Sequence, residues 1–504
     1  MDHLFKFNHN NFTPTFHTTI LQEPIFLALF AVGFFLVLKT YFISSSPPIY
    51  LVDYSCLKPP NHLRVPFSSF LEHSRIVHSL DQQSVDFLSK VLVSSGQSQR
   101  TYIPPSLHYI PPRSTHEDAI KEAQTVLFPV FEDLLTKTQL SPREIDIIIV
   151  NCSGFCPFPS LSAIIVNRFS MREDVKSFNI SGMGCSASAL AVDMAQNLLK
   201  VHNNSNAVIL STEILSNGWY AGKDRSMMIL NCLFRSGSAA ILMTNKTSAK
   251  RILKYRLLYA QRTQGTFDDI SYNSAIREED SEGFTGVTLK KDVLHVAGEL
   301  LRANFQVLGS SILPLEEKIR YEFSIVRRKF IDKSIELYVP NFRKVIQHYC
   351  LPTSVKSVIM EIGKKMKLKE EDIEAALMTL HRFGNHSSSS LWYELAYMEG
   401  RERVKQGERV LGWGVDLNVQ VCRPEPWGSG QHWYQSRRLD EGTMTASNNN
   451  IGKLRRTKEN CLGTRQRLNF KRNSWSEDRR EILSRFENLN IDRRRVNLGG
   501  KDMV

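Results

Sequence analysis

The chain has 504 residues, 42% of them hydrophobic and 10% aromatic, so it is long enough and apolar enough to bury a large core. Its formal net charge of +13 invites a nucleic-acid or membrane partner, but roughly half of the excess lies in the C-terminal tail. The eight cysteines do not form a small disulfide framework, and none has zinc-ligand spacing with a second pair, so we expect reduced thiols in a cytosol-facing body.

The N-terminus is predicted to anchor the chain in a membrane. Residues 1–23 are polar, and residues 24–43 form an apolar run of about the length that a bilayer span needs, with Lys39 snorkelling near one end. A cleaved signal peptide is the alternative, but the basic start is weak and Lys39 stands where a small-residue cleavage site is expected. Lys58 and Arg64 follow the run, which favours a cytosolic body.

The globular part begins after a linker of serines and prolines at 44–48. The isoleucine-rich segment 145–151 predicts a buried strand, and 206–211 predicts another. Between them, 176–188 leads into a helical pattern that runs to Leu199. Strands that alternate with helices indicate an α/β fold.

The same alternation predicts two α/β domains in sequence. Residues 50–287 would form the first half, and residues 288–410 a second, with helices at 370–377 and about 389–405. Residues 411–504 would form a basic, disordered tail.

Cys185 is the candidate nucleophile. It follows Gly182-Met183-Gly184, where a strand should end and a helix begin. Glycines permit a sharp turn and close approach of a substrate, and a helix N-terminus favours thiolate, so we expect a lowered thiol pKa. The alternative is a small buried cysteine that fills space under a helix, which the surrounding Gly-x-Gly-Cys-Ser-Ala-Ser pattern makes the weaker interpretation.

Several segments besides this loop resemble one family, the plant 3-ketoacyl-CoA synthases. The matching motifs are Tyr54-Ser-Cys-x-Lys-Pro-Pro60, Tyr109-Ile-Pro-Pro112, Asn151-Cys-Ser153, Pro159-Ser-Leu-Ser162, Asn231-Cys-Leu-Phe-Arg-Ser-Gly237, Val296-Ala-Gly-Glu299, Leu380-His-Arg-Phe-Gly-Asn385 and the run from Ser387 to Tyr397. The resemblance covers roughly residues 50–410. It implies a thiolase fold of two pseudo-symmetric α/β halves behind an N-terminal transmembrane helix, held in the endoplasmic reticulum membrane with the catalytic domain facing the cytosol.

The resemblance also implies a reaction in very-long-chain fatty acid biosynthesis. Cys185 would take the acyl group from a long-chain acyl-CoA as a thioester, and malonyl-CoA would lose CO2 and attack it, giving a 3-ketoacyl-CoA. No metal or bound organic cofactor is implied. A homodimer and other enzymes of an elongase complex are the expected protein partners, and nucleic acid is not an expected partner.

Asn385 matches the catalytic asparagine of the family, and His381 and His348 match two histidines associated with activity. The amide of Asn385 would donate a hydrogen bond to the thioester oxygen on which negative charge develops. From the residues alone, Asn385 is as readily a turn residue and each histidine a satisfied core group.

Two positions depart from the family. Pro352 stands where most relatives have their principal catalytic histidine, and Gln264 stands where they have another histidine. Neither residue can shuttle a proton. Two alternatives therefore stay open beside the enzyme: a catalytically inactive relative that acts as an elongase-complex partner, and a soluble polyketide-type synthase, which the predicted anchor disfavours.

The C-terminal end departs further. The family closes with a strand, a glycine-rich turn and Lys-Cys-x-Ser, but after Val410 this chain continues differently. One set of codons that encodes residues 412–421, read in a shifted frame, gives Met-Gly-Ser-Gly-Pro-Lys-Cys-Thr-Ser-Leu. We therefore hypothesise that the tail after about Val410 is translated out of frame, from a frameshift or an error in the gene model.

Overall fold

The computed structural model describes residues 31–35, 47–77, 80–246, 253–334, 336–412 and 415–420. Its main sheet has nine strands in the order β3-β2-β4-β5-β1-β6-β11-β10-β9, and β7 and β8 form a separate hairpin. The strands are β1 (Tyr50–Cys56), β2 (Ile147–Asn151), β3 (Lys176–Ile180), β4 (Asn206–Thr212), β5 (Ser238–Thr244), β6 (Tyr255–Ala260), β7 (Ala275–Glu279), β8 (Thr285–Leu289), β9 (His348–Cys350), β10 (Arg409–Gly412) and β11 (Val415–Val419).

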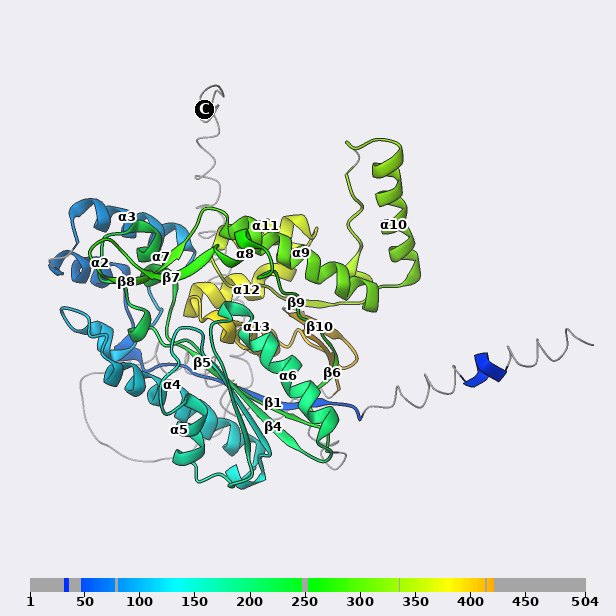
Figure 1. Cartoon of the computed structure of the whole chain (residues 1–504), viewed down its shortest axis with the longest axis horizontal. Coiled ribbons are helices and arrows are strands. Elements are labelled where there is room, and N and C mark those ends of the chain that lie inside the picture. The colour runs from blue at the N-terminus through cyan, green and yellow to red at the C-terminus, as the bar shows by residue number, and fades with distance from the viewer. Residues whose placement is uncertain are drawn as a thin grey trace, which may run out of the picture. The chain divides into compact units, whose positions relative to one another are not determined.

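Helices cover both faces of this sheet (Figure 1). They are α2 (Phe67–Ile76), α3 (Gln82–Ser95), α4 (His116–Thr138), α5 (Leu161–Arg168), α6 (Ala187–Val201), α7 (Arg225–Leu233), α8 (Asp269–Tyr272), α9 (Val293–Ile312), α10 (Leu315–Phe330), α11 (Lys356–Lys365), α12 (Glu370–Phe383) and α13 (Ser390–Gly400).

The strand order repeats once along the chain. In the first half, β1 pairs antiparallel with β5, β5 antiparallel with β4, and β4 parallel with β2. In the second, β6 pairs antiparallel with β11, β11 antiparallel with β10, and β10 parallel with β9. The two sets meet where β1 pairs antiparallel with β6. By strand order, therefore, the second half begins with β6 at Tyr255, earlier than the boundary at 287 and 288 predicted from the sequence.

Alternating side chains along the strands build two cores. In β2, Ile147 and Ile149 pack with α6 and α13, whereas Ile148 and Val150 pack with α4 and α5 on the other face. Period-two alternation is what places successive strand residues on opposite faces. Both faces of β2 are buried, which explains its uninterrupted apolar sequence.

The second half is built in the same way. Val410 of β10 joins the core around α6 and α13, and Leu411 joins a further cluster with α11 and α12. The helices α6 and α13 thus pack against strands of both halves. Each of these helices begins directly after a one-turn 3-10 helix, η4 (Gly184–Ser186) before α6 and η8 (Ser387–Ser389) before α13.

The predicted start of the tail at residue 411 is wrong. Leu411 and Gly412 belong to β10, and Val415, Leu417 and Val419 of β11 are buried between β6 and β10. Residues 421–504, the remainder of the predicted tail, lie outside the described residues.

The predicted membrane anchor also lies largely outside the described residues. Of residues 24–43 only 31–35 are described, and they are helical. No helix formed by the described residues is both long enough and apolar enough to cross a bilayer.

Candidate active site

Cys185 lies at the turn between β3 and α6, where the sequence pattern predicts it. The strand ends at Ile180, and Gly182 and Gly184 then adopt positive φ angles of 71° and 55°. Nothing lies within 4 Å of a Cβ built on either glycine, so the requirement for glycine is conformational and not one of space. The loop from 181 to 184 is exposed and Cys185 is half-buried in η4.

The electrostatics of the thiol differ from the prediction. Burial raises the pKa of Cys185, the negative charge of Glu213 raises it further, and a hydrogen bond from Ser387 opposes the rise. The expectation of a lowered pKa from the helix N-terminus is therefore wrong, because the loss of solvent outweighs the helix end. At neutral pH the sulfur carries its proton, so nucleophilic attack requires a proton acceptor.

Glu213, directly after β4, is the acidic group that acts on this thiol. Its carboxylate accepts hydrogen bonds from the backbone N–H of Gly154 at 2.7 Å and of Ser153 at 3.3 Å. Burial raises the pKa of Glu213, while these bonds and a hydrogen bond with Ser387 lower it. No motif in the sequence selects Glu213, since it comes close to Cys185 through the pairing of β4 with β2 and β2 with β3.

Asn385 lies on the loop between α12 and η8. The residue is 4% exposed, and its backbone oxygen accepts a hydrogen bond from the N–H of Arg235 at 2.9 Å. Its side-chain oxygen Oδ1 accepts one from the N–H of Ser387 at 2.8 Å. The amide nitrogen Nδ2 makes no hydrogen bond to any residue that the structure describes, so it remains available as a donor to a ligand.

Ser387 joins the two loops. Its hydroxyl donates to the sulfur of Cys185, with an Oγ–Sγ distance of 3.6 Å, and its backbone N–H donates to the side-chain oxygen of Asn385. Because η4 and η8 occupy equivalent places in the two halves, the thiol and the amide come from corresponding loops that pack against each other. The structure thus brings Cys185 and Asn385 together.

The structure places His348 elsewhere. This residue begins β9, and its Nε2 lies 2.7 Å from a carboxylate oxygen of Glu408, just before β10. Its ring makes no hydrogen bond to Cys185 or Asn385 among the described residues. His381 occupies the last turn of α12, four positions before Asn385, and its backbone carbonyl accepts from the N–H of Ser98 at 2.9 Å.

A histidine that the sequence reasoning missed, His386, lies inside the site. It is 1% exposed, and its ring centroid is 4.4 Å from that of Tyr393. A Cβ built on Gly237 would lie 2.6 Å from this ring, so the ring packs directly on the backbone there. Burial lowers the pKa of His386 to about 3, so the ring is neutral at physiological pH and acts as a packing group. The one signal in the sequence that His386 lies in the site is its position directly after Asn385.

Neither residue that replaces a family histidine supplies an imidazole equivalent. Pro352 follows β9, and the preceding residue, Leu351, donates its N–H to Glu394 at 2.8 Å. Burial raises the pKa of Glu394 well above its usual range. Gln264 donates to the hydroxyl of Thr266 at 2.6 Å on the exposed surface.

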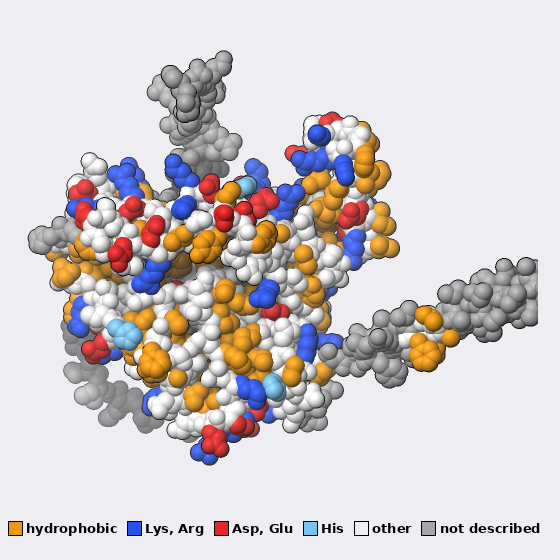
Figure 2. Space-filling model, viewed as in Figure 1, with side chains coloured by type: hydrophobic (Ala, Val, Ile, Leu, Met, Phe, Trp, Pro, Cys, Tyr) orange, Lys and Arg blue, Asp and Glu red, His pale blue; other side chains and the backbone are white. Residues whose placement is uncertain are grey.

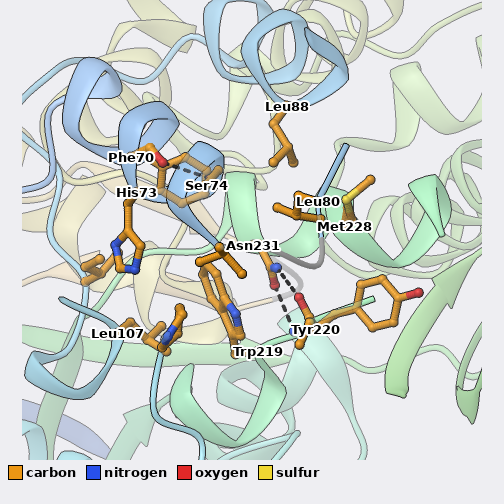
Figure 3. A pocket seen from close by; sticks show the side chains of 14 residues that line it. Phe70, His73, Ser74, Leu80, Leu88, Leu107, Trp219, Tyr220, Met228 and Asn231 are labelled. Atoms are coloured by element: carbon orange, nitrogen blue, oxygen red, sulfur yellow. Dashed lines mark hydrogen bonds between the residues drawn. The ribbon is translucent and has the colours of Figure 1, made fainter. Parts of the chain in front are cut away.

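A small apolar pocket with a cavity volume of about 30 Å³ lies between α2, α3 and α7 (Figure 3). Leu88 and Met228 border one side in that view, with His73 and Leu107 on the other, and Trp219 between. Asn231, which also lines it, is tied to Tyr220 by two hydrogen bonds of 3.2 and 2.7 Å. Phe234, three positions after Asn231, forms a β-bridge with Asn385. A short segment therefore connects this pocket to the Asn385 loop.

Comparison with known proteins gives these loops a context. Residues 41–330 match a family model described as FAE1/Type III polyketide synthase-like protein. Two proteins of Arabidopsis thaliana are similar to most of the chain. One, 3-ketoacyl-CoA synthase 5, is 48% identical over 391 residues, which cover 77% of this chain and 80% of that protein. The other, 3-ketoacyl-CoA synthase 6, is 46% identical over 408 residues, which cover 80% of this chain and 82% of that protein.

Among solved structures, a fungal type III polyketide synthase, ORAS, superposes with a TM-score of 0.58 at 14% identity, covering 74% of this chain and all of that one. A point mutant of CsyB superposes with a TM-score of 0.58 at 15% identity, covering 75% of this chain and all of that one. These likenesses establish a thiolase-like α/β fold. The resemblance read from the motifs is confirmed, and the chain belongs to the 3-ketoacyl-CoA synthase family, the condensing enzymes of very-long-chain fatty acid elongation.

Proposed function

We propose that this chain condenses a long-chain acyl-CoA with malonyl-CoA through a thioester on Cys185. The observation that carries the proposal is the contact between Ser387 and Cys185, which brings the nucleophile and the Asn385 amide into one site. Asn385 retains an amide donor that bonds no described residue, and Ser387 links this residue to the sulfur of Cys185. Acyl transfer followed by carbanion stabilisation requires such a nucleophile and such a donor in one site.

In the acylation step, the Cys185 sulfur attacks the thioester carbon of the acyl-CoA as its proton passes to Glu213. The Ser387 hydroxyl donates to the sulfur of Cys185, and its interaction with Glu213 lowers the pKa of that carboxyl. A carboxylate whose pKa burial has raised is a better base for a thiol than an ordinary one. The bond from the acyl carbon to the CoA sulfur then breaks, and the CoA thiolate takes the proton from Glu213.

In the condensation step, malonyl-CoA loses CO2, and the electron pair of the broken C–C bond moves toward its thioester oxygen. The Nδ2 of Asn385 donates a hydrogen bond to that oxygen, where a well-placed donor is worth about 3 kcal/mol. The carbanion attacks the acyl thioester, a new C–C bond forms, and the Cys185 thiolate leaves and regains a proton from solvent. The products are a 3-ketoacyl-CoA and CO2. The roles that the resemblance implies for His381 and His348 would be indirect, since no step above uses either ring, and the scheme involves no metal or organic cofactor.

The proposed place for the distal end of the acyl chain is the apolar pocket, which has to widen from its cavity volume of about 30 Å³ to take the chain. A tryptophan at Met228 would fill it and shift products toward shorter chains in an assay over a series of acyl-CoAs. Val93→Trp on α3 is the matched control, because Val93 is exposed. An unchanged product profile in Met228→Trp would refute this part of the proposal.

We also propose that the chain is held in the endoplasmic reticulum membrane by residues 24–43 with its body in the cytosol, and that it forms a homodimer within an elongase complex. Support comes from the apolar run at 24–43 and the basic residues Lys58 and Arg64 that follow it. Fractionation of cells that express the full chain, with and without residues 24–43, tests the anchor.

The second candidate function is a silent elongase partner, which Pro352 favours because it removes the imidazole that most relatives use. Mass spectrometry of Cys185 after incubation with acyl-CoA separates the two. An active enzyme forms the acyl thioester and loses it when malonyl-CoA is added, whereas a silent partner does not turn it over. Pro352→His would then speed turnover at least tenfold if the missing imidazole limits the rate, since acid–base catalysis contributes about 10²–10⁴-fold.

A further inference from the structure

Helix α10 projects from the body at the end of α9 (Figure 1). Its inner face is held by Glu317, which is fully buried and accepts hydrogen bonds at 2.8 Å from the hydroxyl of Tyr338 and from the N–H of Asn341. Lys344 completes this contact with an ion pair to Glu317 at 2.7 Å. The helix is therefore fixed on one face by a built polar cluster.

The opposite face of α10 is an apolar stripe. Large side chains recur at intervals of three or four positions, which places them in one row along a helix. The stripe consists of Leu315, Ile319, Phe323, Val326 and Phe330, which are 71%, 58%, 62%, 48% and 74% exposed. Figure 2 shows the corresponding hydrophobic surface along the projecting arm, with basic side chains beside it. Contiguous exposed apolar surface of this kind marks an interaction site and not a solvated surface.

Basic residues flank the stripe on both sides. At 100° per residue, Lys318 and Lys329 fall along one edge and Arg320 and Arg327 along the other. Arg327, Arg328 and Lys329 make no ion pair with any described residue, whereas Arg320 pairs with Glu316 at 2.6 Å. Glu322 is the exposed acid near the stripe, and Glu316 is already neutralised by Arg320 and Lys344.

We propose that α10 lies in the plane of an anionic phospholipid surface, with its stripe inserted at the boundary between headgroups and acyl chains. The basic edges complement lipid phosphates, as in amphipathic helices that lie in a membrane interface. A second copy of the chain is a poorer occupant, because two net-basic helices would face each other across an apolar seam. The inference rests on the proposed membrane location of the enzyme, and it gives that enzyme a second contact with the bilayer that contains its substrates.

The test uses the full chain in phospholipid nanodiscs, with a photoreactive benzoylphenylalanine in place of Phe323. Irradiation should join residue 323 to lipid acyl chains in discs that contain phosphatidylserine, and severalfold less in discs of phosphatidylcholine alone. The same probe at Val93 of α3 is the matched control, since Val93 is 74% exposed on the body and should not reach lipid. Crosslinks from 323 to a second copy of the chain, to another protein, or to nothing would overturn the proposal.

Charge variants test whether the basic residues of α10 give it a preference for anionic lipid. The triple variant Arg327→Gln, Arg328→Gln, Lys329→Gln should lose the preference for phosphatidylserine at the 323 probe. Lys364→Gln, Lys365→Gln, Lys367→Gln removes the same charge from the α11 region and should retain it. A preference unchanged in the α10 variant would contradict the electrostatic part. Because the readout is a lipid crosslink, its failure alongside normal condensation would overturn the α10 contact and leave the proposed function intact.

Discussion

The hydroxyl of Ser387 lies 3.6 Å from the sulfur of Cys185, although 202 residues separate them in the chain. This contact crosses from η8 of the second half to η4 of the first, so acyl transfer chemistry depends on how the halves pack. It also brings Glu213 into the same network, because Ser387 interacts with that carboxylate as well. Substitutions in this network should therefore have separable effects on the pKa of the Cys185 thiol, on the rate of acylation and on the rate of condensation.

Ser387→Ala should raise the pKa of Cys185 further, because it removes the hydrogen bond that favours thiolate. A bond of about 1 kcal/mol corresponds to roughly fivefold less thiolate at neutral pH. The rate of Cys185 alkylation, followed by mass spectrometry against pH, should shift to higher pH. Ser186→Ala is the control, since its hydroxyl bonds the carbonyl of Met183 instead. Identical profiles for the two variants would show that the Ser387 contact does not govern the thiol.

Glu213→Gln should change two rates in opposite directions. Loss of the negative charge lowers the pKa of Cys185, so alkylation at neutral pH should become severalfold faster. Loss of the proton acceptor should slow acylation by acyl-CoA about 100-fold. Glu132→Gln, at an exposed site on α4, should alter neither rate. If both rates fell together in Glu213→Gln, Glu213 would be a structural residue and not the base.

Asn385→Asp should separate the two chemical steps. The aspartate keeps an oxygen that can accept from the N–H of Ser387, but it has no amide donor. Acylation of Cys185 should proceed, while condensation with malonyl-CoA falls about 100-fold or more, as expected for loss of an oxyanion donor. Thioester accumulation on Cys185 is the measurement. Equal loss of both steps, in protein that remains folded, would argue against the assigned role of the amide.

Truncation should show that the sheet ends at β11 and not at Val410. A chain that ends at Gly412 keeps β10 but loses the buried Val415, Leu417 and Val419 of β11, side chains worth about 1.5–3 kcal/mol each. That sum approaches the whole stability of a typical domain, about 5–15 kcal/mol. A chain that ends at Gln420 should keep the thermal unfolding transition of the full chain, and the shorter one should lose it. If both truncated chains unfolded alike, β11 would not be the limiting element.

Much of the first half could be predicted from its local pattern. The strands expected at 145–151 and 206–211 are β2 and β4, and the helix after Cys185 ends at Val201, close to the expected Leu199. In the second half, α12 continues to Phe383 beyond the expected 377, and α13 ends at Gly400 before the expected 405. Helix ends depend on tertiary contacts such as the Arg235 bond to Asn385, which no local pattern reports.

The site was predicted in part. Cys185 and Asn385 lie together, but Glu213, His386 and Ser387 required the folded chain, because strand pairing and the equivalence of η4 and η8 bring them together. The thiol pKa was predicted in the wrong direction, since burial cannot be read from a position at a helix start. β11 was missed because the basic composition of the whole tail concealed the short alternation of apolar residues from 415 to 419.

The most decisive measurement is condensation by this chain itself. The full chain and Cys185→Ala would be expressed in membranes of a host without endogenous elongating activity, and supplied with a series of long acyl-CoAs and labelled malonyl-CoA. We expect labelled 3-ketoacyl products from the unmodified chain and none from the variant. Equal product from both, or none from unmodified protein that is present in the membrane and acylated on Cys185, would contradict the proposed condensation.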